Sequence, residues 1–150
     1  MRPQSVVFVE PPYVIVMMAH PTEGEDSLEE TVQFLRTAPL DLVQITKFTP
    51  YPGTPSYATI RQHGRFTENW ERMNAMNWVF VPHGLTPEVL ERYFRRAYRA
   101  FYTRPDVLWG LAKTLAGEPR FVGPVARYIR VGLREWLAVD PARGSEALAS

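Results

Sequence analysis

Hydrophobic residues form two kinds of pattern in the first third of the chain. Residues 13–19 are apolar throughout, which is typical of a strand buried on both faces of a parallel sheet, and residues 42–48 give a second short run that reads as another buried strand. Between them, apolar residues recur at helical spacing until Pro39 prevents the helix from continuing. The pattern predicts a strand–helix–strand unit with parallel strands and a right-handed crossover. The apolar positions of the helix are Leu28, Val32 and Leu35, with Phe34 at the margin.

Polar residues mark the start of this helix. Asp26 or Ser27 can cap it, and acidic side chains in the first turns favour the helix dipole. Two strands and one helix cannot bury a core on both sides of a sheet, so sheet edges and one face should be uncovered. We therefore expect the isolated chain to be marginally stable or oligomeric.

The pattern after residue 54 is mostly helical. Residues 55–64 predict a short helix that ends at Gly64, residues 70–75 predict another helical turn, and residues 77–82 read as extended. A capping hydroxyl followed by proline at residues 86–87 predicts a helix that runs to about residue 102. Its apolar positions are Leu90, Tyr93, Phe94, Ala97, Tyr98 and Phe101, with Arg92, Arg95, Arg96 and Arg99 largely off that face.

Further elements are predicted at the two ends of the chain. Helices are predicted at 104–117 and 124–138, a short strand at 6–9, and disorder in the polar tail. We expect residues 1–58 to form an α/β part, residues 59–138 to form a helical C-terminal extension, and residues 139–150 to be disordered.

Composition narrows the chemistry. The chain has 150 residues, 45% hydrophobic, and a net charge of +1. It contains no cysteine, which excludes disulfides, thiol nucleophiles and an iron–sulfur cluster held by this chain alone. No apolar run approaches the length needed to cross a bilayer, and residues 1–9 make a poor signal peptide, so we expect a cytoplasmic protein. The first fifty residues hold three basic and seven acidic side chains, so an acidic front and a basic back can attract each other, or the back can face an acidic partner.

Candidate chemistry gathers at the end of each predicted strand. The loop 48–57 holds three prolines and a glycine, so it is stiff, and loops at the carboxyl ends of parallel strands are where α/β proteins bind ligands. His20 and Glu23 end the first strand at the same edge. The alternative is a proline-stiffened connection with no ligand, which the local chemistry alone favours. The histidines at 20, 63 and 83 lack metal-ligand spacing, so no metal site is expected.

Three segments at this spacing resemble a known family: Ala19-His-Pro-Thr-Glu23, Ser27 to Leu35, and Gln44-Ile-Thr-Lys-Phe-Thr-Pro-Tyr-Pro-Gly-Thr-Pro-Ser-Tyr57. They resemble the last part of the radical S-adenosylmethionine (SAM) barrel, in its cobalamin-binding branch. That branch includes anaerobic magnesium-protoporphyrin IX monomethyl ester cyclases and hopanoid-modifying enzymes. Residues 74–87 and 98–109 look like its C-terminal extension. The resemblance covers roughly residues 13–115 and implies an α/β fold: a βαβ remnant of a TIM-like barrel followed by a mostly helical extension.

The resemblance also implies a site. It places His20, Pro21, Glu23, Phe48 and Thr49 near the adenosine part of SAM, with Ala19 standing where the family usually has glycine. In the family, a four-iron four-sulfur cluster, SAM and cobalamin act together. The parent enzyme is expected to cleave SAM reductively to a 5′-deoxyadenosyl radical and to modify a tetrapyrrole or terpenoid-like substrate.

The chain departs from the family in one decisive respect. The CxxxCxxC motif that holds the cluster is absent, so this chain alone is expected to be inactive. The expected partners are the rest of the barrel and the cobalamin domain. Residues 6–13 resemble the opening strand of that domain, which suggests a parent gene with its middle deleted; a chance match is the alternative.

A different class of function stays open for the helical half of the chain. The segment from about residue 86 to residue 138 can be a non-catalytic module that contacts a partner, an apolar substrate or a membrane surface. The arginines of the first helix can form an anion stripe or simply a solvated face, and the second interpretation is favoured because no nucleic-acid motif accompanies them. We expect no nucleic-acid partner.

Overall fold

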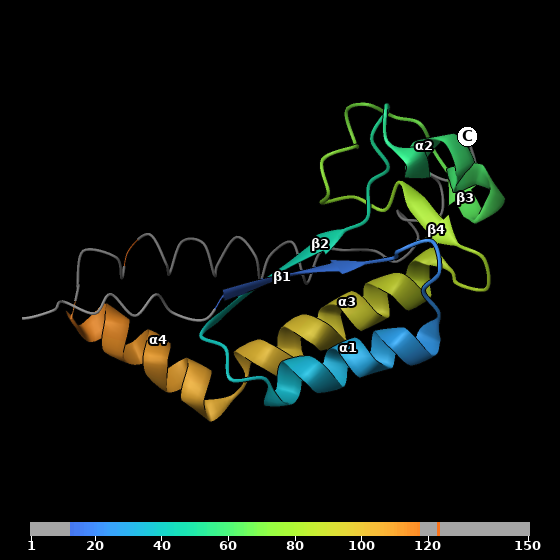
Figure 1. Ribbon diagram of the computed structural model, residues 1–150. Helices are drawn as coiled ribbons and strands as arrows, with labels where there is room; N and C mark the ends of the chain where they lie inside the picture. The colour runs from blue at the N-terminus through green and yellow to red at the C-terminus, as the bar shows by residue number, and fades with distance from the viewer. Residues whose placement is uncertain (1–12, 118–122, 124–150) are drawn as a thin grey trace, which may run out of the picture.

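The computed structural model describes residues 13–117 and residue 123 (Figure 1). The strand expected at 6–9, the helix expected at 124–138 and the tail 139–150 lie outside the described residues. The elements, in chain order, are β1 (Tyr13–Met18), α1 (Glu25–Thr37), β2 (Leu42–Lys47), α2 (Pro55–Thr59), the 3₁₀ turn η1 (Ile60–Gln62), β3 (Gly64–Phe66), β4 (Phe80–Pro82), α3 (Pro87–Tyr102) and α4 (Pro105–Gly117).

The first half of the chain forms the expected strand–helix–strand unit. β1 and β2 pair in parallel, from Tyr13 opposite Leu42 to Met18 opposite Lys47, and α1 connects them. The predicted apolar face of α1 is buried, whereas Phe34 at its margin is half exposed. The cap differs from the prediction: α1 begins after Gly24, and the Ser27 hydroxyl donates to the Gly24 carbonyl oxygen at 3.1 Å.

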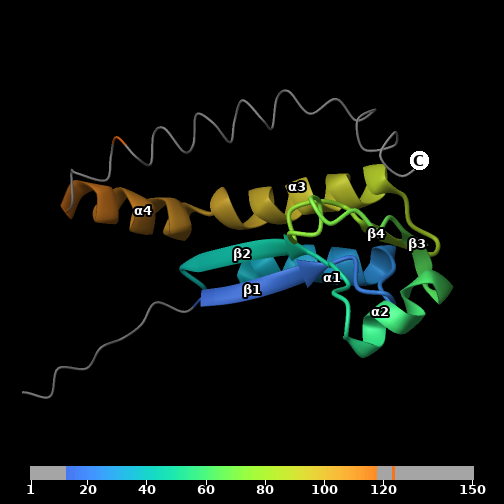
Figure 2. The same cartoon turned by 90° about the horizontal axis from the view of Figure 1, so that it is seen from above.

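α1 and α3 together cover one face of this sheet. Figure 1 shows the two helices side by side beneath the strands, and Figure 2, seen from above, shows α3 running along β2. The α3 helix starts as predicted, with the Thr86 hydroxyl accepting from the Val89 N–H at 3.3 Å. The core contains these buried residues: Met18, Leu28, Leu35, Val43, Ile45, Phe80, Leu90, Ala97 and Phe101.

Ion pairs join the acidic front of the chain to its basic back. Arg92 of α3 pairs with Glu25 of α1 at 3.4 Å, and Arg96 pairs with Glu29 at 2.8 Å. The predicted attraction between the two regions is therefore confirmed. These two arginines are exposed but engaged with α1, so they are not a bare anion-binding stripe.

The outer face of the sheet agrees with the prediction that one face is uncovered, and shows that β1 is not a strand buried on both faces. Tyr13, Ile15 and Met17 of β1 are about half exposed, whereas the alternating Val14 and Val16 pack against the core. The cause is that, among the described residues, helices lie beneath the sheet only. The unbroken apolar pattern of β1 thus serves one packed face and one open face.

The two edges of the sheet also differ. The outer edge of β2 is closed by hydrogen bonds from other elements: the Tyr98 hydroxyl accepts from the Ile45 N–H at 3.4 Å and donates to the Ile45 carbonyl oxygen at 3.3 Å. The Tyr102 hydroxyl donates to the Val43 carbonyl oxygen at 2.8 Å, and the Lys47 N–H donates to the Ala75 carbonyl oxygen at 2.8 Å. β1 pairs with β2 alone among the described strands.

A second, antiparallel sheet corrects the prediction for residues 55–82. The helix predicted to reach Gly64 ends earlier, in α2 and η1, and Gly64 instead begins β3. A Cβ at Gly64 would lie 2.1 Å from the Val81 carbonyl oxygen, so this glycine permits the close approach of β4 rather than ending a helix. The helical turn predicted at 70–75 forms as hydrogen-bonded turns, in which the Met73 N–H donates to the Trp70 carbonyl oxygen at 3.3 Å, and no helix follows from them. Only Phe80–Pro82 of the predicted extended segment is a strand.

Candidate functional site

The structure brings the predicted site residues together at the carboxyl end of the parallel sheet. β1 ends at Met18 and β2 ends at Lys47, and the Phe48 N–H donates to the Met18 carbonyl oxygen at 2.8 Å. The turn 19–23 and the loop 48–54 therefore leave the sheet side by side. The rings of His20 and Phe48 meet edge-on, with centroids 5.7 Å apart.

The turn after β1 is built around a carboxylate. Glu23 Oε2 accepts from the backbone N–H groups of Ala19 at 2.5 Å and His20 at 3.3 Å, and the Glu23 N–H donates to the His20 carbonyl oxygen at 2.9 Å. Ala19 adopts a φ of 69°, a region that glycine enters more easily. The alanine thus holds a backbone conformation that glycine would adopt without steric cost.

The Glu23 carboxylate is already hydrogen-bonded to backbone N–H groups of its own turn. Burial raises the pKa of Glu23 above its ordinary value, although the two N–H groups oppose that shift. Because the carboxylate closes the turn, it positions His20 and Pro21, of which His20 is exposed and Pro21 is half-buried.

The loop after β2 is stiff, as its prolines predict. Phe48 is buried and its ring also packs edge-on against Phe80, with centroids 5.7 Å apart. The Thr49 side chain is nearly buried, and its hydroxyl donates to the Lys47 carbonyl oxygen at 3.3 Å. Further along, the Tyr51 hydroxyl donates to the Met73 carbonyl oxygen at 3.2 Å. The side chains of Phe48 and Thr49 are therefore buried behind this edge and do not project from it.

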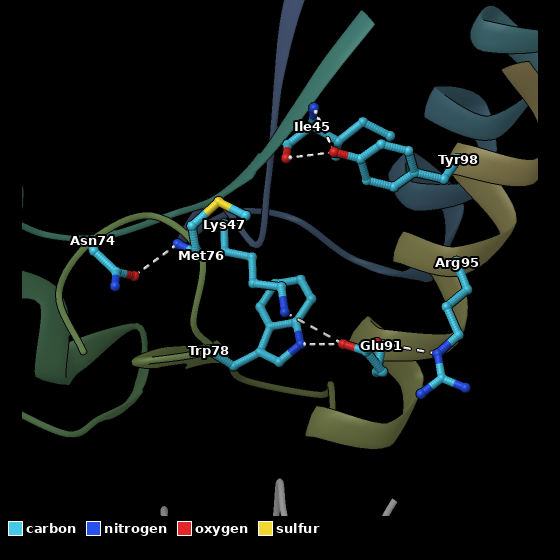
Figure 3. A network of polar contacts seen from close by, with 8 residues as sticks. All are labelled: Ile45, Lys47, Asn74, Met76, Trp78, Glu91, Arg95 and Tyr98. Carbon is cyan, nitrogen blue, oxygen red and sulfur yellow. Dashed lines mark hydrogen bonds and ion pairs between the residues drawn. The ribbon is translucent and has the colours of Figure 1, made fainter. Parts of the chain in front are cut away.

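A charged cluster missed by the sequence analysis anchors the end of β2 (Figure 3). Lys47 Nζ lies 3.4 Å from Glu91 Oε2 of α3, and 4.4 Å from the centroid of the Trp78 ring. The same carboxylate accepts from Trp78 Nε1 at 2.9 Å and from Arg95 Nε at 3.1 Å. Phe94 completes the ring contacts of the ammonium group, at 4.6 Å. The cluster ties β2, the segment before β4 and α3 into one unit.

Burial perturbs both members of this ion pair. It lowers the pKa of Lys47, although Glu91 works against that shift. Burial also acts to raise the pKa of Glu91, but Lys47, Trp78 and Arg95 together hold that pKa below its ordinary value. The sequence signal for this cluster is a single one: Lys47 is the lone cation at the end of an otherwise uncharged strand.

The other candidate chemistry falls outside this edge. His63 and His83 lie together elsewhere, where the His83 N–H donates to the His63 carbonyl oxygen at 2.9 Å across β3 and β4. No group of three histidine, aspartate or glutamate side chains that could hold a metal ion occurs within residues 13–117. In the same part of the chain, every helix is too short or too polar to cross a bilayer.

Comparison with curated proteins shows similarity to methyltransferases. The chain is 32% identical over 93 residues to an uncharacterised methyltransferase of Pyrococcus horikoshii, a match that covers 61% of this chain and 20% of that protein. It is 30% identical over 84 residues to the bacteriochlorophyllide d C-8(2)-methyltransferase of Chlorobaculum tepidum, covering 55% of this chain and 19% of the relative. The chain therefore spans about a fifth of the length of each relative. No family model matches the chain, and no solved structure matches it.

Proposed function

We propose that this chain is the C-terminal part of a cobalamin-dependent radical SAM methyltransferase, with a βαβ remnant of the barrel and a mostly helical extension. The observation that carries the proposal is the turn at the end of β1. Ala19 has the positive φ that suits the glycine of the family, and the Glu23 carboxylate closes the turn beside the loop after β2. Similarity to two methyltransferases supports methyl transfer as the activity of the whole enzyme.

The residues at this edge fit part of SAM. The exposed His20 imidazole and the backbone of the two loops offer hydrogen-bonding groups suited to the adenine and ribose. The nearby charged groups are already engaged, Glu23 by two N–H groups and Lys47 by Glu91. The amino-acid end of SAM therefore needs residues from the remainder of the enzyme.

The chain does not fit the four-iron four-sulfur cluster. It has no cysteine in 150 residues, and no group of three histidine, aspartate or glutamate side chains within residues 13–117 replaces the thiolates. Reductive cleavage of SAM, the radical chemistry and the cobalamin site thus belong to the remainder of the enzyme. After anaerobic treatment with iron and sulfide, we expect no cluster absorbance near about 400 nm; stoichiometric iron retention would contradict the proposal.

A chimera tests the site directly. The 84-residue part of this chain that matches the bacteriochlorophyllide d methyltransferase would replace its counterpart in that enzyme. SAM binding would be measured by equilibrium dialysis, with methylated product as a second readout. We expect the chimera to bind SAM and His20→Ala to weaken binding about tenfold, as for the loss of hydrogen bonds worth about 1.4 kcal/mol. The matched control is His83→Ala, an exposed histidine away from the edge. A folded, cluster-loaded chimera that does not bind SAM would overturn the proposal.

A second candidate function rests on α4. No residue of this helix is buried, and Leu108, Trp109 and Leu111 are all exposed. This surface fits an apolar substrate or a membrane interface better than the solvent. Flotation with liposomes tests the membrane version: binding at physiological salt that Trp109→Ala abolishes would favour it, and absence of binding would remove it.

A further inference from the structure

Lys47, the last residue of β2, is the point where the loop of the candidate site leaves the sheet. Its N–H donates to the Ala75 carbonyl oxygen at 2.8 Å, and its carbonyl oxygen accepts from the Thr49 hydroxyl at 3.3 Å. Phe48 follows it directly and donates its N–H to the end of β1, at 2.8 Å from the Met18 carbonyl oxygen. Because these bonds meet at or beside one residue, a shift of Lys47 would move Phe48 and Thr49 with it.

The side chain of Lys47 is held in place by α3 and by the segment before β4 (Figure 3). Its ammonium group lies 3.4 Å from Glu91 Oε2 and over the rings of Trp78 and Phe94, and only 12% of the side chain is exposed. The Glu91 carboxylate is in turn fixed by Trp78 Nε1 at 2.9 Å and by Arg95 Nε at 3.1 Å. Charge-assisted hydrogen bonds are stronger than neutral ones, so the position of Glu91 on α3 restricts where the end of β2 can lie.

The segment before β4 also holds the same loop at a second point. The Tyr51 hydroxyl donates to the Met73 carbonyl oxygen at 3.2 Å. Two residues further on, Ala75 has a φ of 60°, a conformation that residues with a side chain rarely adopt and that persists where the surroundings hold it. Strained residues of this kind cluster at functional sites. The segment therefore does more than connect β3 to β4: it fixes the loop of the candidate site, and Glu91 fixes the segment through Trp78.

We infer that Glu91 is a positioning residue for the candidate site. Acting through Lys47 and Trp78, it holds the first residues of the loop after β2 in the place that ligand binding at this edge requires. Its effect on a ligand is indirect, because its carboxylate is engaged by side chains of its own chain. The inference rests on the proposed function only for the identity of the ligand, which is SAM. It is compatible with a barrel fragment, because none of these contacts uses the edge of β1 that faces away from β2.

Hydrogen exchange of the full chain tests the positioning role without a ligand. Glu91→Gln keeps the shape of the side chain but removes the charge that holds the Lys47 ammonium. We expect the amides of Lys47 and Phe48 to exchange at least about tenfold faster in this variant, as for the loss of one hydrogen bond to a charged group. Adding Lys47→Met to Glu91→Gln should not speed exchange of the Phe48 amide further, because the two residues act as a unit.

The matched control is Val32→Ala, which removes methyl groups from a buried residue in the middle of α1. This variant lowers the stability of the whole fold, so it should speed exchange of the amide of the fully buried Phe101. It should leave the amides of Lys47 and Phe48, which open locally, unchanged. If the two variants act alike on Lys47 and Phe48, or if Glu91→Gln changes neither amide, Glu91 only adds to overall stability and the inference is overturned.

SAM binding gives a second readout, in a chimera whose exchanged part includes residues 19–95. Glu91→Gln should raise the dissociation constant for SAM about tenfold, whereas Val32→Ala should leave it unchanged. An unchanged dissociation constant in Glu91→Gln would overturn the positioning role. A folded chimera with the unmodified sequence that fails to bind SAM would instead overturn the proposed function, and the exchange rates of the full chain would still decide whether Glu91 positions the loop.

Discussion

The two edges of the parallel sheet are built from the same kind of strand and finished in opposite ways. On the β2 side, Tyr98, Tyr102 and Ala75 bond to its backbone, and the Lys47–Glu91 pair fixes its end. On the β1 side, the described chain supplies no bonded partner, and apolar side chains face outward. The residues that seal the β2 edge lie 28 to 59 positions away in sequence, so a well-formed strand does not seal its own edge.

The largest expected effect is the loss of a buried phenylalanine ring on the β2 side of the sheet, compared with the loss of a half-exposed ring on the β1 side. Phe101→Ala empties a fully buried site in α3 and should lower the free energy of unfolding by about 3–5 kcal/mol. Phe34→Ala removes the same ring from the open side, where it is half exposed, and should cost less than about 1 kcal/mol. Urea denaturation at low protein concentration measures both. Equal losses would mean that Phe34 is packed and that the β1 side is not open.

The charged cluster at the end of β2 predicts a pH dependence. Because partners hold the pKa of Glu91 below its ordinary value of 4.5, the folded state binds fewer protons than the unfolded state near that pH. The stabilisation is therefore present above about pH 4.5 and is lost as the pH falls through the lowered pKa. Glu91→Gln should cost about 2 kcal/mol at neutral pH and flatten this acid limb of the stability curve.

Lys47 should affect the alkaline limb of the curve of stability against pH. Burial lowers its pKa, so the unfolded state binds more protons, and this residue should add stability as the pH rises towards 10.5. Lys47→Met should remove that rise. Glu30→Gln, at an exposed position on α1, is the control for both variants. Stability curves that keep both limbs in Glu91→Gln and Lys47→Met would show that the cluster does not fix the end of β2.

Local patterns were enough to predict the elements of the sheet, but not how its edges are finished. The spacing of Leu28, Val32 and Leu35 reports a helix face directly, because period and burial coincide. Gly64 was assigned to a helix end because glycine often ends helices. In the structure a glycine is needed there because Val81, seventeen residues away, approaches the backbone closely. At the candidate site the sequence placed the two loops at one edge, but not the inward use of Glu23 or the Lys47–Glu91 pair, which join residues whose proximity only the fold creates.

The smallest effect concerns a single hydroxyl on each side of the sheet. Tyr102→Phe removes the hydrogen bond to the Val43 carbonyl oxygen at the sealed edge and should cost about 1 kcal/mol, because the carbonyl is left without that donor in a partly buried site. Tyr13→Phe removes an exposed bond to Gln44 Oε1, which water can replace, so its stability should be nearly unchanged. Thermal and urea denaturation of the pair measure the difference. A second readout sharpens it: a β2 edge loosened by Tyr102→Phe should exchange the Ile45 amide proton faster, whereas Tyr13→Phe should leave that proton unaffected. Equal behaviour of the two variants would mean that the tyrosine hydroxyls of α3 do not seal the edge, and that the packing of their rings alone holds α3 against β2.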